Sequence, residues 1–123
     1  MRRLILSSAA AMLIAAPAFA HPDLVSSTPA ADATVAPTNR VEITFSDKLT
    51  AQSVGATLEM VDMPGMRMAA PMKMKAATSV STDGMTLIAT TSKPLPKGTY
   101  KLTYHVASAD THGVDGDLAF TVQ

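Results

Sequence analysis

Sulfur-bearing side chains crowd one short segment of this sequence. Six methionines fall within the fifteen residues from 60 to 74, namely Met60, Met63, Met66, Met68, Met72 and Met74. Met63-Pro64-Gly65-Met66 has the composition of a type II turn, because proline presets φ at about −65° and glycine accepts the positive φ of the next position. Such a turn brings its flanking residues within about 7 Å, so two flexible thioether side chains can converge on one ion.

Thioether sulfur is a soft metal ligand, and among biologically available first-row metals it selects Cu(I). A packing role for these methionines fits poorly, because Pro71 and the charged residues Arg67 and Lys73 give the segment the composition of an exposed loop. We therefore predict a Cu(I) site whose ligands come from Met60, Met63, Met66, Met68 and Met72, with Met74 as a further candidate. A methionine-rich surface that binds another protein is the alternative.

A second candidate metal site depends on processing near the N-terminus. Two arginines precede an apolar run over residues 4–16, and the small-residue sequence Ala18-Phe19-Ala20 follows, which is typical of a secretory signal peptide. Cleavage after Ala20 makes His21 the first residue, so its α-amino group and imidazole can chelate one metal ion near neutral pH. Pro22 has no backbone N–H, which disfavours a peptide-bound copper site and favours ligands from elsewhere in the fold.

The other ligands of this second site are expected near the C-terminus, in the sequence Ser108-Ala109-Asp110-Thr111-His112. Two nitrogens from His21, an imidazole from His112 and a carboxylate oxygen from Asp110 suit a tetragonal Cu(II) ion. An Asp-x-His pair alone is more often part of a solvated turn, so the prediction depends on its combination with the terminal histidine. His105 alternates with apolar residues in a predicted strand, and we expect a surface histidine there rather than a ligand.

Composition places both candidate sites in one small domain. The chain has 123 residues, 47% of them apolar and 16% charged, without cysteine or tryptophan. Removing residues 1–20 leaves 103 residues (123 − 20) with eight basic and ten acidic side chains, and a net charge of 8 − 10 = −2 argues against nucleic-acid binding. The apolar run of 13 residues is shorter than the roughly 20 that a membrane-spanning helix needs. We expect a signal peptide at 1–20, a single domain at 21–123 and no membrane anchor.

The elements that must position these residues are predicted to be β-strands. Apolar and polar residues alternate in several segments, and proline or glycine separates them. The predicted strands cover residues 24–27, 41–45, 56–61, 75–81, 85–90, 100–106 and 118–122. Residues 28–38, rich in proline and alanine, are expected to connect the first two strands. Seven short strands in about 100 residues predict an all-β fold, a Greek-key β-sandwich or barrel.

Five motifs spread over the mature chain form a recognisable set. They are the opening His21-Pro22-Asp23-Leu24-Val25-Ser26-Ser27-Thr28-Pro29, Val41-Glu42-Ile43-Thr44-Phe45-Ser46, Met63-Pro64-Gly65-Met66, Gly98-Thr99-Tyr100 and Ser108-Ala109-Asp110-Thr111-His112. Together they resemble the CopC/PcoC family of periplasmic copper-resistance proteins. The resemblance implies a seven-stranded cupredoxin-like, Ig-like barrel with copper sites at opposite ends, one binding Cu(II) through His21, Asp110 and His112 and one binding Cu(I) through the loop methionines.

This chain departs from one feature of the family. Some members carry a histidine two residues after the Met-Pro-Gly-Met turn, whereas Met68 stands there in this sequence. An all-thioether site should favour Cu(I) over Cu(II) more strongly than a mixed site does.

The predicted function is a monomeric periplasmic copper carrier for copper resistance or homeostasis, without enzymatic activity. It would hold Cu(II) and Cu(I) separately and pass copper to partners, and the resemblance implies an inner-membrane copper transporter or other periplasmic copper proteins. The alternative is a histidine-brace copper oxidase or mono-oxygenase. The few aromatic residues provide no platform for a polysaccharide, and Asp110 would fill a position that oxygen needs. A third interpretation is a metal-free adhesion-type sandwich.

Overall fold

The computed structural model describes residues 22–66, 68–109 and 113–123. These residues form two β-sheets and one short 3-10 helix, η1 (Ala51–Ser53). The four-stranded sheet has the order β1 (Leu24–Thr28), β3 (Arg40–Phe45), β7 (Thr86–Thr90), β6 (Ala77–Val80). The five-stranded sheet has the order β2 (Thr34–Val35), β9 (Gly113–Val122), β8 (Gly98–Ala107), β4 (Gly55–Asp62), β5 (Met72–Met74). No helix in this part of the chain is long and apolar enough to cross a membrane.

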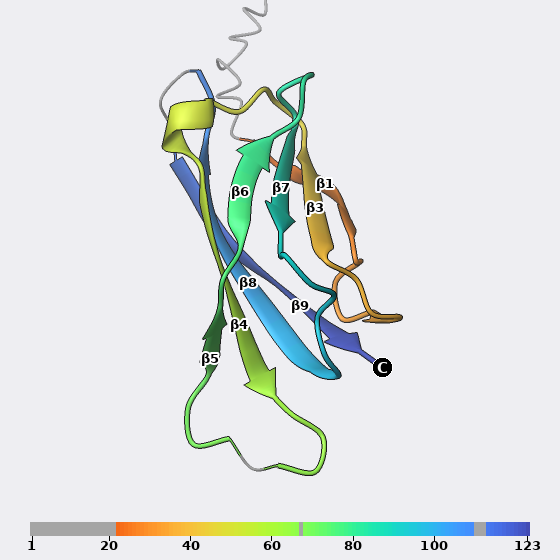
Figure 1. Cartoon of the computed structure of the whole chain (residues 1–123). Helices are drawn as coiled ribbons and strands as arrows, with labels where there is room; N and C mark the ends of the chain where they lie inside the picture. Colours follow the sequence, from red (N-terminus) through yellow and green to blue (C-terminus); the bar gives the residue numbers. More distant parts are fainter. Residues whose placement is uncertain (1–21, 67, 110–112) are drawn as a thin grey trace, which may run out of the picture.

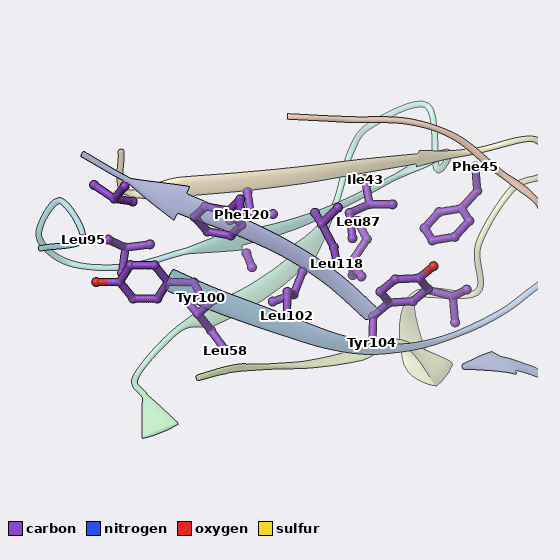
Figure 2. Packing of buried hydrophobic residues seen from close by; sticks show 14 of the residues in the cluster. Ile43, Phe45, Leu58, Leu87, Leu95, Tyr100, Leu102, Tyr104, Leu118 and Phe120 are labelled. Carbon is purple, nitrogen blue, oxygen red and sulfur yellow. The ribbon is translucent and has the colours of Figure 1, made fainter. Parts of the chain in front are cut away.

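Strand alternation creates the core between the two sheets. Every second residue of β3 and β8 is buried, and Figure 2 shows these side chains pointing into the space between the sheets. Phe45 meets Tyr104 edge to face with ring centroids 5.5 Å apart, and Tyr100 stacks on Phe120 at 5.6 Å. Fully burying a large apolar side chain contributes roughly 1.5–3 kcal/mol relative to leaving it exposed. The Phe45–Tyr104 contact joins the two sheets, whereas the Tyr100–Phe120 contact lies within the five-stranded sheet, between the paired strands β8 and β9.

The β-sandwich class predicted from the sequence is confirmed, but the strand count differs. The described residues contain nine strands rather than seven. The two additional strands are β2, which pairs in parallel with the end of β9, and β5, which pairs with β4. They have only two and three residues, too few for an alternation pattern, and their partners along the sheet determine that they are strands.

Strand β4 runs between the two ends of the sandwich. Gly55, its first residue, pairs with His105, and Asp62, its last, precedes Met63. At about 3.3 Å per residue, the eight steps from residue 55 to residue 63 span roughly 25 Å. Figure 1 shows the β4–β5 loop extending beyond the sheets at the lower end, with η1 and the start of β4 at the upper end. The methionine loop thus lies far from His105.

Candidate metal centres

The turn in the β4–β5 loop has the conformation that its sequence predicts. Gly65 has a φ of +78°, as a type II turn requires at its third position. The Met66 N–H donates a hydrogen bond to the Met63 carbonyl oxygen at 3.1 Å, and the two residues form an isolated antiparallel bridge. The backbone therefore holds these two methionines close together.

Four of the predicted thioether ligands line one hollow of about 420 Å³, together with residues 69–71; they are Met63, Met66, Met68 and Met72. Met66 is 63% exposed and Met72 is 49% exposed, which a role in core packing does not explain. The described residues that line the hollow carry no charge, and thioether sulfur is their only side-chain metal donor. This donor set fits Cu(I) and offers little to hard ions such as Mg²⁺ and Ca²⁺.

Two methionines of the predicted set lie elsewhere. Met60 is 1% exposed in the core, and a Cβ atom added to Gly98 would lie 3.3 Å from the Met60 Cε. The structure therefore does not bring Met60 to the hollow, although the sequence prediction included it. The reason is strand alternation, which places Met60 on the same inward face of β4 as Leu58. Met74 pairs with Leu58 and borders a different hollow.

The three predicted Cu(II) ligands, His21, Asp110 and His112, lie outside the described residues. Pro22, which follows His21, is the first described residue and is buried. The Asp23 N–H donates a hydrogen bond to the Ser46 Oγ at 2.9 Å, and the Ser46 N–H donates to the Asp23 carbonyl oxygen at 2.8 Å. The start of the described chain is therefore attached to the end of β3.

The segments that flank the Asp-Thr-His motif reach the same end of the sandwich. Ser108 forms an isolated bridge with Leu49, and the Thr50 N–H donates to the Ala107 carbonyl oxygen at 2.8 Å. Ala107 in turn pairs with Gly113, the first residue after the motif. Residues 46–50 therefore contact both Asp23, near the start of the described chain, and residues 107–108, which precede the motif and pair with Gly113 after it.

His105 lies on the outer face of β8, as the alternation predicts. Its side chain is 54% exposed, and its Nδ1 lies 2.5 Å from an Asp115 carboxylate oxygen. The imidazole packs against Gly113, where a Cβ atom would lie 2.8 Å from the His105 Cε1, so a larger residue at position 113 would displace the ring. No cluster of three or more His, Cys, Asp or Glu residues that could hold a metal ion occurs within the described ranges.

The two tyrosines pack in the core. The Tyr100 hydroxyl donates a hydrogen bond to the Pro96 carbonyl oxygen at 2.5 Å, and burial raises the pKa of Tyr100. Burial also raises the pKa of Tyr104, and the nearby Asp117 carboxylate raises it further. Both shifts favour the neutral phenol.

Comparison with known proteins places this geometry in a family. The CopC domain model matches residues 24–123. Copper resistance protein C of Xanthomonas campestris pv. juglandis is 47% identical over 114 residues, covering 93% of this chain and 89% of that protein. Copper resistance protein C of Escherichia coli is 37% identical over 123 residues, covering 100% of this chain and 98% of that protein.

Solved structures agree with the sequence comparisons. The structure of selenomethionine PcoC, a copper resistance protein from Escherichia coli, matches with a TM-score of 0.79 and 37% identity, covering 83% of this chain and 100% of that one. CopC from Methylosinus trichosporium OB3b has the same fold, with a TM-score of 0.65, over 84% of this chain and 94% of that one. These matches define a class of small β-sandwich proteins. The chain belongs to the CopC family within that class.

Proposed function

We propose that this chain binds copper in the periplasm and contributes to copper resistance or homeostasis, after removal of residues 1–20. Membership of the CopC family and the names of its copper-resistance relatives support the general function. The observation that carries the proposal is the hollow lined by four methionines, two of them largely exposed. A hollow whose described lining is uncharged and offers thioether sulfur has the donor chemistry of a Cu(I) site.

In this proposal the Cu(I) ligands come from the four methionines of the hollow, Met63, Met66, Met68 and Met72. All four lie within ten residues of sequence: Met63 and Met66 in the turn, Met68 between the turn and β5, and Met72 at the start of β5. Met60 is left out of the ligand set because its side chain packs in the core. The exposure of Met66 and Met72 favours exchange, since a partner can approach the bound ion from their side without unfolding the loop.

The Cu(II) ligands in this proposal are His21, through its α-amino group and imidazole, together with Asp110 and His112. The attachment of residues 23 and 108 to the same segment, 46–50, supports this set. Nitrogen and carboxylate oxygen are the donors that tetragonal Cu(II) prefers. The copper sites would then lie at opposite ends of the sandwich.

Two sites of different softness make the chain a carrier rather than an enzyme. A change of oxidation state changes the preferred site, so the ion can leave one site for the other or for a partner. The partners we propose are an inner-membrane copper transporter or other periplasmic copper proteins. A histidine-brace oxygenase acting on polysaccharide has no support in the described surface, because Tyr100 and Tyr104 are both buried.

A Cu(I) competition assay tests the proposal. The chain beginning at His21 is titrated against a chromogenic Cu(I) chelator, beside a variant with Met63→Leu, Met66→Leu, Met68→Leu and Met72→Leu. Leucine keeps the volume and removes the sulfur, so we expect the variant to lose Cu(I) binding. Met85→Leu, outside the hollow, is the matched control and should bind normally. Equal Cu(I) affinity in all three proteins would contradict the proposed site.

A further inference from the structure

Two adjoining hollows lie where both sheets end, on the side of the molecule that carries β5 and β6. One has a volume of about 450 Å³ and is bordered by Met74, Lys75 and residues 91–96. The other has about 280 Å³ and is bordered by Lys75, Ala77 and residues 90–92. They share Lys75, Thr91 and Ser92, so we treat them as one trough, the edge groove.

The edge groove lies where β5 ends and β6 begins, and Met74 and Ala77 are the described residues of these two strands that border it. β5 is the last strand of the five-stranded sheet and β6 the last of the four-stranded sheet, and the chain passes from one sheet to the other through residues 75 and 76. β6 pairs only with β7 within the described chain, which leaves its outer backbone groups without a strand partner there. Such an edge accepts an extended peptide through main-chain hydrogen bonds.

Charge defines which kind of peptide fits. Lys75 and Lys93 border the edge groove, both are exposed, and neither forms an ion pair with another described residue. No acidic residue lines either hollow. Between residues 63 and 109 the sequence has six basic residues and one acidic residue, Asp83. Asp83 lies in the β6–β7 turn, at the opposite end of these strands from the groove.

The edge groove adjoins the candidate Cu(I) site. Met72 lines the methionine hollow and Met74 borders the groove. Both pair with inward-facing residues of β4, so they share one face of β5. Two residues of a strand span about 7 Å. A segment seated in the groove would therefore continue directly toward the methionine hollow.

We propose that the edge groove docks an extended, carboxylate-rich segment of a protein that exchanges copper with this chain. Lys75 and Lys93 attract the carboxylates, the Ser92 hydroxyl offers a hydrogen bond, and the free edge of β6, which begins at Ala77, aligns the peptide backbone. Attraction between opposite charges raises the association rate more than the lifetime of the complex, which suits a partner that must leave after transfer. The role in copper exchange rests on the proposed function, whereas the docking itself does not.

An NMR titration of the copper-free mature chain tests the docking. The probe is an N-acetylated hexaglutamate peptide at low ionic strength, with hexaserine as the uncharged comparison. We expect hexaglutamate, but not hexaserine, to shift the amide signals of Lys75, Ala77, Thr91 and Ser92. The affinity for hexaglutamate should fall severalfold at 0.15 M salt, where the Debye length is about 8 Å. Absence of shifts, or shifts spread evenly over the lysines of the whole surface, would overturn the proposal.

Charge reversal supplies the matched variants. Lys75→Glu with Lys93→Glu should weaken hexaglutamate binding at least tenfold, and the milder Lys75→Gln with Lys93→Gln should weaken it less. Lys48→Glu, at an exposed lysine beside the β6–β7 turn, should leave binding unchanged. Loss of binding in the Lys48→Glu control, or unchanged binding in both groove variants, would contradict the assignment of the site. Concentration-dependent shifts of the same amides without peptide would identify a second copy as the occupant and overturn it as well.

A Cu(I) competition assay separates this proposal from the proposed function. The groove variants should keep the Cu(I) affinity of the native chain, because neither lysine lines the methionine hollow. A native chain that binds hexaglutamate at the groove without binding copper would refute the proposed function and the copper-exchange role while leaving the docking site established. A chain that binds Cu(I) but not hexaglutamate would refute the docking site alone.

Discussion

The two ends of the sandwich offer copper different chemistry. At the β4–β5 loop, the described donors are thioethers that carry no charge and do not titrate. At the other end, the exposed side chains include the paired His105 and Asp115, and the proposed ligands are nitrogen and oxygen groups. In the proposed function, soft and hard donors separated by roughly 25 Å of strand allow one small fold to distinguish the two oxidation states of copper.

The ends also differ in how the chain builds them. The described residues that line the methionine hollow all fall between positions 63 and 72, so its donors are local in sequence. The opposite end joins Asp23, residues 46–50, residues 107–108 and Gly113 through hydrogen bonds and bridges. The proposed Cu(I) site therefore depends mainly on a local turn, and the proposed Cu(II) site depends on segments distant in sequence.

The largest effect on copper affinity is expected from one additional residue before His21. This change removes the α-amino group from the Cu(II) ligands. Structural zinc sites with four ligands are worth about 10–16 kcal/mol, so by analogy one ligand corresponds to about 3 kcal/mol, or roughly 100-fold in affinity. Cu(I) affinity should not change. Competitive titrations with each oxidation state measure both, and unchanged Cu(II) affinity would show that the terminal amine is not a ligand.

Replacing Met60 with alanine tests whether this buried methionine stabilises the core without binding Cu(I). The truncation leaves a cavity beneath Gly98 and Tyr100 and should cost about 2–5 kcal/mol of unfolding free energy. Cu(I) affinity of the folded variant should match that of the native chain. Urea unfolding and chelator competition provide the two measurements, and Met60→Leu is the control that keeps the volume. A large loss of Cu(I) affinity in Met60→Leu would return Met60 to the ligand set.

Proton competition should affect one end only. Imidazoles titrate near pH 6.5 and α-amino groups near 7.7–8.0, so acidification protonates the Cu(II) ligands and lowers the Cu(II) affinity. Below about pH 6.5 the loss should approach tenfold per pH unit for each imidazole. Thioethers bind no proton in this range, so Cu(I) affinity should stay nearly constant between pH 7.5 and pH 5.5. Parallel losses at both sites would contradict the assignment of donors.

The smallest effect is expected at His105. Both side chains of the His105–Asp115 pair are exposed, and exposed pairs of this kind contribute about 0–1 kcal/mol to stability. His105→Gln should therefore unfold at nearly the same urea concentration as the native chain and leave the Cu(II) electron paramagnetic resonance spectrum unchanged. Loss of a nitrogen coupling from that spectrum would make His105 a ligand.

Much of the fold was predictable because most strands carry alternating side chains. In segments such as 41–45 and 100–106, one face of the strand is buried and the other is more exposed. The alternation of apolar and polar residues in the sequence therefore follows the burial of the side chains. The strands β2 and β5 were not predictable, because two or three residues show no period and their pairing is decided by neighbours that are distant in sequence. The sequence therefore predicts the sheets better than their edges.

The candidate Cu(I) site was predictable to a similar extent. Met63 and Met66 follow from the turn chemistry of Pro64-Gly65, which acts locally. The burial of Met60 could have been recognised, since it falls in phase with Leu58 within a predicted strand. The edge groove had no signal in the sequence, because Lys75 and Lys93 come to border one hollow only when β6 pairs with β7.

One titration tests the central claim that the chain holds copper in two chemically distinct sites. The mature chain beginning at His21 is titrated with Cu(II) under electron paramagnetic resonance, then reduced with ascorbate in the presence of a competing Cu(I) chelator. We predict one tetragonal Cu(II) per chain and, after reduction, one Cu(I) retained against the chelator by the methionine hollow. Cu(II) binding without retained Cu(I) would contradict the two-site account, and absence of both would contradict copper binding itself.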